Sequence, residues 1–464
     1  MKNIKWPIAV TIALTLMLLF PGAFAAADEE WASVAIQDVH INFPDDVVFS
    51  VEFTSDRPVE RVVLSFRVEG RDSTRREPAT VETGDTLSAE FVLKTRGGSS
   101  LFIPPGAILT YSWTFEDEDG NTVKSEPVTF IYMDTRFEWE TVNTEMVTVF
   151  YNGPTQTRAE TILDAVGITL RNMGAMLKTS LSRHINMVVY NNPLQMQEVF
   201  PFVSKTTSSG LITLGQAYYK EGVILIMGSD RRIRGTASHE MSHILIAEAG
   251  EGPGVRLPAW LNEGLSEIGN LEPGTSYDLA LLMGVREDRL LPITHMISSP
   301  GTPEDAIMLY GQSRNIVKFM IETYGQPKLA ELLRLYKNGS INIDDALMQI
   351  YGFDQVKLDN LWRDSIGLPP LSEGRTGNRP VGDPTPIPTR VPLGAPTPAI
   401  APTPEAPPEP TGELSTDSEG LAILQDAYGA RTGDPAFVAA ADLNADGVIN
   451  YIDLAILGSG YTGP

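Results

Sequence analysis

Two histidines four residues apart, with a glutamate directly after the first, are the residues of this chain best placed to do chemistry. They lie in the segment His239-Glu240-Met241-Ser242-His243, and the chain has only five histidines in 464 residues. Residues four apart share one face of a helix, so both imidazoles can present a nitrogen to one metal ion. Glu240 then lies beside the coordination position that stays open for water. The spacing predicts a zinc site that activates a water molecule for hydrolysis.

The sequence after this segment supplies a candidate for the third metal ligand. Apolar residues after His243 extend the helix, and the glycine-rich stretch Gly250-Glu-Gly-Pro-Gly254 lets the chain double back. A second helix, starting near Pro258-Ala259, then returns Glu263 to the histidines as a ligand. Glu267, one helical turn further, is expected to accept the second ring N–H of a ligand histidine and so fix its orientation. The alternative, two ordinary polar histidines on a helix, leaves the placement of the glutamates unexplained.

Hydrolysis also needs a donor that stabilises the oxyanion, and two residues are candidates for it. Tyr310 lies in Met308-Leu-Tyr-Gly-Gln, and His295 ends the segment Pro292-Ile-Thr-His. A phenol or an imidazole can donate a hydrogen bond to the developing charge. The alternative for Tyr310 is packing in the core, which is the more common role of a tyrosine at helical spacing. We keep both residues as candidates beside Glu240, the expected general base.

The zinc pattern resembles that of a known family. The HEMSH segment followed by Leu257-Pro-Ala-Trp-Leu-Asn-Glu-Gly-Leu-Ser-Glu267 is similar to the gluzincin clan of zinc metallopeptidases, and most to its peptidase MA-like group of secreted bacterial proteins. The resemblance spans residues 134–367. It implies an α+β peptidase acting on a peptide or protein, with Glu240 as base and with the ligands His239, His243 and Glu263. The sequence lacks the thermolysin-type tyrosine and histidine motifs and the aminopeptidase-type glycine and methionine motif, so the substrate class stays open.

A second interpretation is a non-catalytic surface, adhesion or scaffold-assembly protein whose metal fold is structural. A structural metal site needs ligands but no base, and Glu240 is the residue that such a site does not require. The sequence therefore favours an enzyme, a zinc metallopeptidase of the HExxH-plus-Glu type with one catalytic Zn²⁺.

The first 25 residues have the composition of a cleaved secretory signal peptide. Lys2 and Lys5 precede an apolar run from Ile8 to Phe20, and small residues follow at Ala23-Phe24-Ala25. The run is shorter than the roughly 20 residues of a spanning helix, and no comparable run occurs later in the sequence. We therefore expect a secreted, extracellular protein without a membrane span once the signal is removed, with association to the cell surface as an alternative.

Composition limits the partners and the metal chemistry. The formal net charge is −24, or −26 without the two lysines of the signal peptide, which argues against nucleic acid and anionic membranes as partners. Cysteine is absent, so disulfides are excluded and any metal is bound by histidine and oxygen ligands.

The hydrophobic pattern divides the mature chain into four parts. Residues 26–133 contain short alternating runs such as Val47–Phe53, which predict six or seven strands of an immunoglobulin- or fibronectin-like β-sandwich. Residues 134–370 mix strands with helices and carry the zinc pattern, as an α+β domain would. Residues 371–412 are crowded with proline, threonine and alanine and predict an extended linker. Residues 413–464 are expected to form a small helical module.

This last part contains a second metal pattern, that of an EF-hand loop. Gly447 falls at loop position 6, and oxygen ligands fall at positions 1, 3, 5, 7, 9 and 12, namely Asp442, Asn444, Asp446, the carbonyl of Val448, Asn450 and Asp453. Leu421-Ala-Ile-Leu recurs as Leu454-Ala-Ile-Leu, but the segment Glu409–Gly420, which aligns with the loop, has lost the ligand pattern. The pattern therefore predicts one structural Ca²⁺.

The final aspartate of the loop and the helix after it resemble a dockerin repeat. The resemblance implies attachment to a cohesin-type scaffold or cell-surface protein. The alternative is a terminal domain that calcium stabilises and that has no partner.

Overall fold

The computed structural model describes most of the chain between Trp31 and Leu371. It covers residues 31–82, 87–95, 102–200, 214–250, 257–298, 303–336 and 341–371, and scattered residues between 420 and 457. The chain forms two compact units. One comprises Met1–Leu257, Leu265–Glu272 and Tyr324–Asn342, and the other Pro258–Gly264, Pro273–Thr323 and Ile343–Pro464. No helix in the described ranges is long and apolar enough to cross a membrane.

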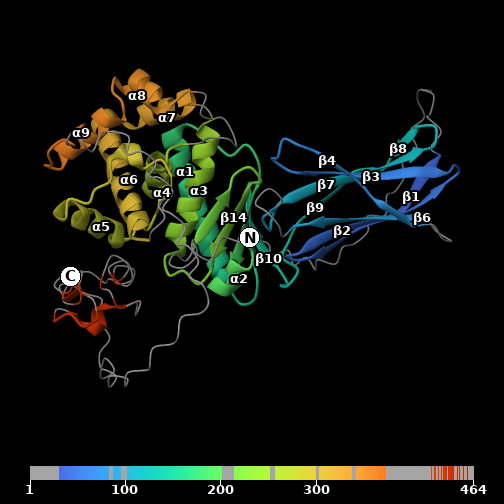
Figure 1. Ribbon diagram of the computed structural model, residues 1–464, viewed down its shortest axis with the longest axis horizontal. Helices are drawn as coiled ribbons and strands as arrows, with labels where there is room; N and C mark the ends of the chain where they lie inside the picture. The colour runs from blue at the N-terminus through green and yellow to red at the C-terminus, as the bar shows by residue number, and fades with distance from the viewer. Residues whose placement is uncertain are drawn as a thin grey trace, which may run out of the picture. The chain divides into compact units, whose positions relative to one another are not determined.

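The N-terminal part of the first unit consists of two antiparallel sheets (Figure 1). One has the strand order β1 (Ala32–Asn42), β2 (Asp46–Ser55), β6 (Leu87–Lys94) and β5 (Thr80–Glu82). The other has the order β4 (Arg75–Pro78), β3 (Val59–Val68), β7 (Ile108–Asp117) and β8 (Thr122–Lys124), with β9 (Val128–Ile131) also paired to β7. More strands are present than the pattern predicts, because β4, β5, β8 and β9 are too short to show alternation.

Alternating side chains build the core of these two sheets. In β2, Val47, Phe49, Val51 and Phe53 are buried, and the residues between them are more exposed. Phe49 packs edge-on against Tyr111 of β7, with ring centroids 5.1 Å apart. The strands predicted from alternation thus face their apolar side chains inward.

A mixed sheet follows, covered on both faces. Its order is β10 (Glu140–Asn143), β11 (Val147–Tyr151), β12 (Ile185–Tyr190), β14 (Val223–Met227) and β13 (Gly215–Tyr218). β11, β12 and β14 are parallel, and β13 is antiparallel to β14 at one edge. One face packs against α1 (Gln156–Leu177) and α3 (Ile233–Ala249), as Figure 1 shows, while the other face belongs to the same hydrophobic core as the N-terminal sheets. Every residue of β12 and β14 is buried, as expected for parallel strands that are covered on both faces of the sheet.

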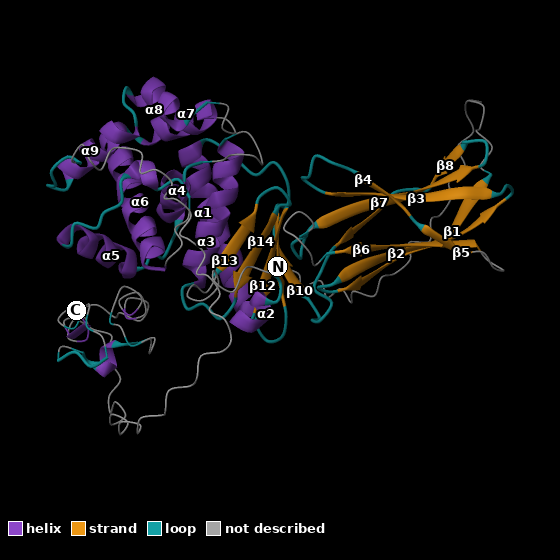
Figure 2. Cartoon of the chain, viewed as in Figure 1, coloured by secondary structure: helices purple, strands orange, loops and turns teal. Residues whose placement is uncertain are grey.

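The remaining elements of the described chain are helices (Figure 2). The elements are α2 (Pro193–Gln197), α4 (Ala259–Gly269), α5 (Thr275–Arg286), η1 (Ile293–His295), α6 (Pro303–Tyr324), α7 (Gln326–Tyr336), α8 (Ile343–Tyr351), α9 (Gln355–Ser365) and η3 (Ala439–Ala441). Helix ends follow local rules. The Asp354 side chain caps α9 by accepting from the Lys357 N–H, and Gly325, with φ +85°, separates α6 from α7.

Several sequence predictions concern residues outside the described ranges. They are the signal peptide, the glycine-rich stretch after Gly250, the linker to residue 412, and the calcium-loop residues Asn444, Asp446, Val448 and Asn450. The immunoglobulin- or fibronectin-like character of the sandwich also stays a prediction.

Asp117 closes the hairpin between β7 and β8 with its carboxylate. It accepts hydrogen bonds from the Asn121 side-chain amide at 2.9 Å and from the backbone N–H groups of Asn121 and Asp119, and it pairs with Arg57 at 3.2 Å. The hydrogen bond from the Asn121 side chain is the main cause that lowers the pKa of Asp117 below its ordinary value of 3.8. The carboxylate therefore stabilises the fold above that pH, and this contribution is lost as the pH falls through the lowered pKa.

We expect Asp117→Asn to lower the midpoint of thermal unfolding at pH 7, because an amide replaces an acceptor of several N–H groups. The difference from the parent should shrink as the pH falls below about 4. Circular dichroism melts between pH 7 and pH 3 measure it. Asp119→Asn is the matched control, since Asp119 contributes its backbone N–H to this network. A loss that is equal at both ends of the pH range would contradict the assignment.

Candidate metal centre

Helix α3 carries both histidines, and the Asp230 carboxylate contacts its first turn. Asp230 accepts hydrogen bonds from the Arg232 N–H at 3.0 Å and from the Thr236 hydroxyl at 2.6 Å, which fixes the first turn. Nearly all of the helix is buried, His239 and Glu240 included. The segment predicted to be a metal-binding helix is therefore a central helix of the first unit.

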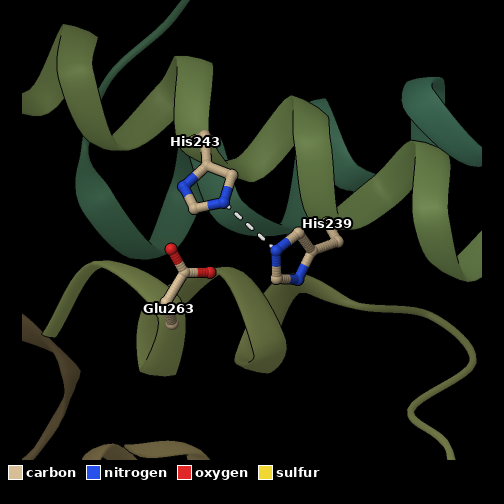
Figure 3. Close-up of side chains that lie close together, drawn as sticks. All are labelled: His239, His243 and Glu263. Carbon is tan, nitrogen blue, oxygen red and sulfur yellow. Dashed lines mark hydrogen bonds between the residues drawn. The ribbon is translucent and has the colours of Figure 1, made fainter. Parts of the chain in front are cut away.

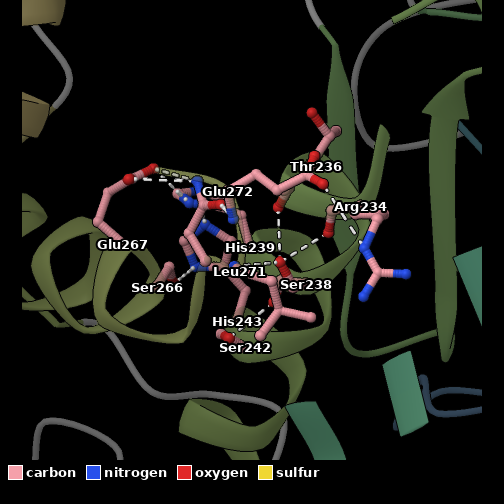
Figure 4. Close-up of polar contacts among 12 residues, drawn as sticks. Arg234, Thr236, Ser238, His239, Ser242, His243, Ser266, Glu267, Leu271 and Glu272 are labelled. Atoms are coloured by element: carbon pink, nitrogen blue, oxygen red, sulfur yellow. Dashed lines mark hydrogen bonds and ion pairs between the residues drawn. The ribbon is translucent and has the colours of Figure 1, made fainter. Parts of the chain in front are cut away.

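The end of α4 and the residues just after it pack tightly on α3. A Cβ atom on Gly269 would lie 2.0 Å from the Ser242 hydroxyl, so only glycine permits this approach. The Leu271 N–H donates to the Ser238 hydroxyl at 2.9 Å. These contacts fix the end of α4 against the middle of α3, and Figure 4 shows the polar part of them.

The structure brings the two histidines and Glu263 together. The Nε2 atoms of His239 and His243 lie 3.1 Å apart, and the candidate ligand atoms of the three residues all lie within 4.8 Å of one another. Figure 3 shows Glu263 pointing from α4 toward both rings. Among the described residues, this is the one group of three or more side chains with metal-binding geometry.

The arrangement fits a zinc ion. Two nitrogens bound at about 2.0–2.1 Å with a tetrahedral angle lie about 3.3 Å apart, close to the separation of the two Nε2 atoms. Two histidines and one glutamate form a ligand set that catalytic zinc uses, with the fourth position left for water. The donor set and its spacing therefore suit one Zn²⁺.

Two neighbouring residues of α4 orient the rings (Figure 4). Glu267 Oε1 lies 2.8 Å from Nδ1 of His239, and the Ser266 hydroxyl lies 2.9 Å from Nδ1 of His243. With Nδ1 directed to these oxygens, Nε2 of each ring is left to face the metal. Glu267 is the residue that the sequence predicts to accept the second ring N–H, and that role stays a prediction. Ser266 was not foreseen. Its signal is the spacing, because residues three and four after Glu263 share its helical face.

Glu240 contacts the edge strand β13. A Cβ atom on Gly215 would lie 2.6 Å from Cγ and 2.7 Å from Oε1 of Glu240, so the backbone of the strand lies directly against this carboxylate. Sequence reasoning passed over Gly215. A glycine within a strand, which often marks a close approach, is the signal that could have selected it.

The two oxyanion candidates have different surroundings. The Tyr310 ring stacks on Tyr277, with centroids 5.5 Å apart and an interplanar angle of 16°. His295 ends η1 and is exposed. Neither belongs to the metal-binding group found in the described part of the chain. Their role toward the oxyanion stays a prediction.

We expect Ser266→Ala to weaken zinc binding about 10-fold, because the His243 ring loses the contact that orients it. Competition with a chromogenic chelator measures the zinc dissociation constant without any assay of activity. Ser182→Ala is the matched control, since the Ser182 hydroxyl contacts Glu248 on the same helix α3 at 2.8 Å. An unchanged zinc affinity in Ser266→Ala would remove the hydroxyl from the site.

The match to a family model covers all three candidate ligands. Residues 159–367 match the model of the Peptidase MA superfamily. The M1 zinc metallopeptidase of Deinococcus radiodurans is 13% identical, with 71% of this chain and 91% of that chain covered and a TM-score of 0.35. The aminopeptidase N family protein of Idiomarina loihiensis is 9% identical, with 66% of this chain and 70% of that chain covered and a TM-score of 0.29. No curated protein matches the chain, and both TM-scores are too low to argue a shared fold. By the family match, residues 159–367 form a domain of the Peptidase MA superfamily.

Proposed function

We propose that the chain is a secreted zinc-dependent peptidase that uses Glu240 as its general base. The observation that carries the proposal is that the candidate ligand atoms of His239, His243 and Glu263 lie within 4.8 Å of one another. The buried Glu240 directly follows His239 in the sequence. The family match over residues 159–367 supports peptide hydrolysis as the reaction. The composition of the first 25 residues supports export.

In this proposal His239, His243 and Glu263 hold the zinc ion. Zinc in such a site lowers the pKa of a bound water and polarises the carbonyl that the water attacks. Glu267 and Ser266 hold the two imidazoles with Nε2 directed inward.

Glu240 moves the proton. It follows His239 directly on α3, and with zinc bound its carboxylate would take a proton from the attacking water. The same carboxyl then returns the proton to the leaving amine. Tyr310 and His295 remain the candidate donors to the oxyanion.

The edge strand β13 supports a peptide as the substrate. Within the described sheet β13 pairs only with β14, so its other side offers backbone N–H and C=O groups to an extended chain. The contact between Gly215 and Glu240 puts this strand next to the proposed base. We infer that a peptide adds to the sheet beside β13, with its scissile carbonyl near the metal.

We expect Glu240→Gln to bind zinc at about one ion per chain and to lose activity by at least about 10²-fold, because the amide cannot accept the proton. Cleavage of a denatured protein, followed with and without a chelator, measures the activity, and metal analysis measures the zinc. Glu248→Gln, on the same helix, is the control. Full activity in Glu240→Gln would contradict the role of the base. Zinc binding by the parent without any cleavage would favour the structural, non-catalytic interpretation instead.

A separate observation supports the calcium site in the C-terminal module. Gly447 has φ +82°, and its N–H donates to Asp442 at 2.8 Å, which is the sharp bend expected at position 6 of the loop. The Leu443 N–H donates to Asp453 at 2.7 Å, so the carboxylates of positions 1 and 12 close the same loop. Asp453 is fully buried. We propose that this loop binds one Ca²⁺ and that the dockerin-like module attaches the enzyme to a cohesin-type or cell-surface protein.

We expect the full chain to bind one Ca²⁺ and Asp442→Ala to lose that binding, because the first ligand of the loop is removed. Isothermal titration with CaCl₂ measures the affinity, and hydrogen exchange of residues 437–457 reports whether calcium orders the module. Asp434→Ala, outside the loop, is the control. Absence of calcium binding in the parent would end the assignment.

A further inference from the structure

We propose that the N-terminal sheets position the catalytic carboxylate: they hold the β13–β14 hairpin, and the hairpin holds Glu240. The inference rests on the proposed role of Glu240 as the base. It gives the sandwich a part in the active site, beyond that of a spacer or an attachment domain.

The first step is the contact between the hairpin and the base. At Gly215 the missing side chain leaves room for the Glu240 carboxylate, whose Cγ, Oε1 and Cδ would lie 2.6–2.9 Å from an added Cβ. β13 has only four residues and one described neighbour in the sheet. A short edge strand gains little support from its own ladder, so its position depends on what contacts the hairpin elsewhere.

The second step is the contact between the sandwich and the turn of this hairpin. Gly70, in the connection from β3 to β4, has φ +81°, and an added Cβ would lie 1.5 Å from the Lys220 carbonyl oxygen. The backbone of the β3–β4 connection therefore contacts the backbone of the β13–β14 turn directly. Next to it, Arg71 Nε pairs with Glu221 Oε1 at 2.7 Å, and Glu221 is 9% exposed. The guanidinium also donates to the Phe102 carbonyl at 2.5 Å, which ties the turn to a second segment of the sandwich.

The third step is the packing along β13 itself. The Phe102 ring lies 5.5 Å from the ring of Tyr218, the last residue of the strand. Burial raises the pKa of Tyr218 well above its ordinary value of 10, with smaller contributions from the carboxylates of Glu221 and Glu240. The phenol thus stays neutral and packs in the core that the sandwich and the sheet share.

These contacts form one chain of support from the sandwich to the base. Arg71 and Gly70 hold the turn from the side of the sandwich, and Arg183 donates to the carbonyls of Tyr219 and Lys220 in the same turn. Phe102 packs at the end of β13, and Gly215 lies against Glu240. A displacement of about 1 Å at a catalytic group costs about 10²-fold in rate. Loosening the turn should therefore reduce catalysis while leaving the zinc ligands, which lie on α3 and α4, in place.

The test removes the Arg71–Glu221 pair in the full-length zinc enzyme with Arg71→Met, Glu221→Gln and the double variant. The probe is a quenched fluorescent peptide built on a site that the parent cleaves in denatured casein. We expect kcat to fall about 3- to 10-fold in each single variant and no further in the double variant, since one interaction is lost in all three. Zinc affinity should stay that of the parent. Arg75→Met removes an exposed pair with Glu77 in the same sandwich and is the matched control.

A second measurement separates positioning from a general loss of stability. In Arg71→Met, hydrogen exchange should become faster at the amides of Gly215–Tyr218 and stay unchanged in α3. Gly215→Ala acts on the last contact alone, because the three atoms nearest to the added methyl group, Cγ, Oε1 and Cδ, all belong to the Glu240 side chain. It should displace the carboxylate and lower kcat about 10²-fold at unchanged zinc content.

Distinct outcomes overturn the two proposals. If the parent enzyme is as inactive as Glu240→Gln, the proposed function is contradicted. The comparison of hydrogen exchange at β13 between the parent and Arg71→Met would then still decide whether the sandwich holds the hairpin. Unchanged exchange at β13 in Arg71→Met, or unchanged kcat in both that variant and Gly215→Ala, would overturn the positioning role.

Discussion

The close contact between α3 and the end of α4 is the constraint on which the metal centre depends. Glycine at position 269 lets the chain approach α3 where a Cβ atom would lie 2.0 Å from the Ser242 hydroxyl. That approach turns one face of α4 toward both histidines, and this face carries Glu263, Ser266 and Glu267. One helix therefore supplies the third candidate ligand and both residues that orient the rings. A larger residue at 269 would disturb all of these contacts together.

Much of this arrangement could be predicted from local sequence. The spacing of His239 and His243 requires a helix if both rings are to meet one ion, and Glu263 and Glu267 share a face by their own spacing. The alternation of apolar and polar residues likewise predicts strands such as β2. In each of these cases the residues that form the sequence pattern also make the contacts of the helix or strand. Residues close together in the sequence are therefore enough to predict it.

What the sequence did not reveal depends on partners far apart in the chain. Gly215 and Ser266 are ordinary residues until the fold puts them beside Glu240 and His243. The sequence predicts a domain boundary after residue 133, where the short alternating runs end. Yet alternation reports only which side of a strand is buried and not what covers it. The same core contains residues of the sandwich and of β12 and β14, a continuity that no local pattern can display.

The burial of Glu240 bears on the choice between an enzyme and a structural metal site. Burying a carboxylate costs free energy unless a positive charge or hydrogen bonds compensate it. Structural zinc sites are usually closed by four protein ligands, whereas His239, His243 and Glu263 supply three and would leave one position for water, as catalytic sites do. In strand β13, the absence of a side chain at Gly215 leaves room for the Glu240 carboxylate. Three candidate ligands with a glutamate directly after the first fit proton transfer to a substrate better than a structural role of the metal.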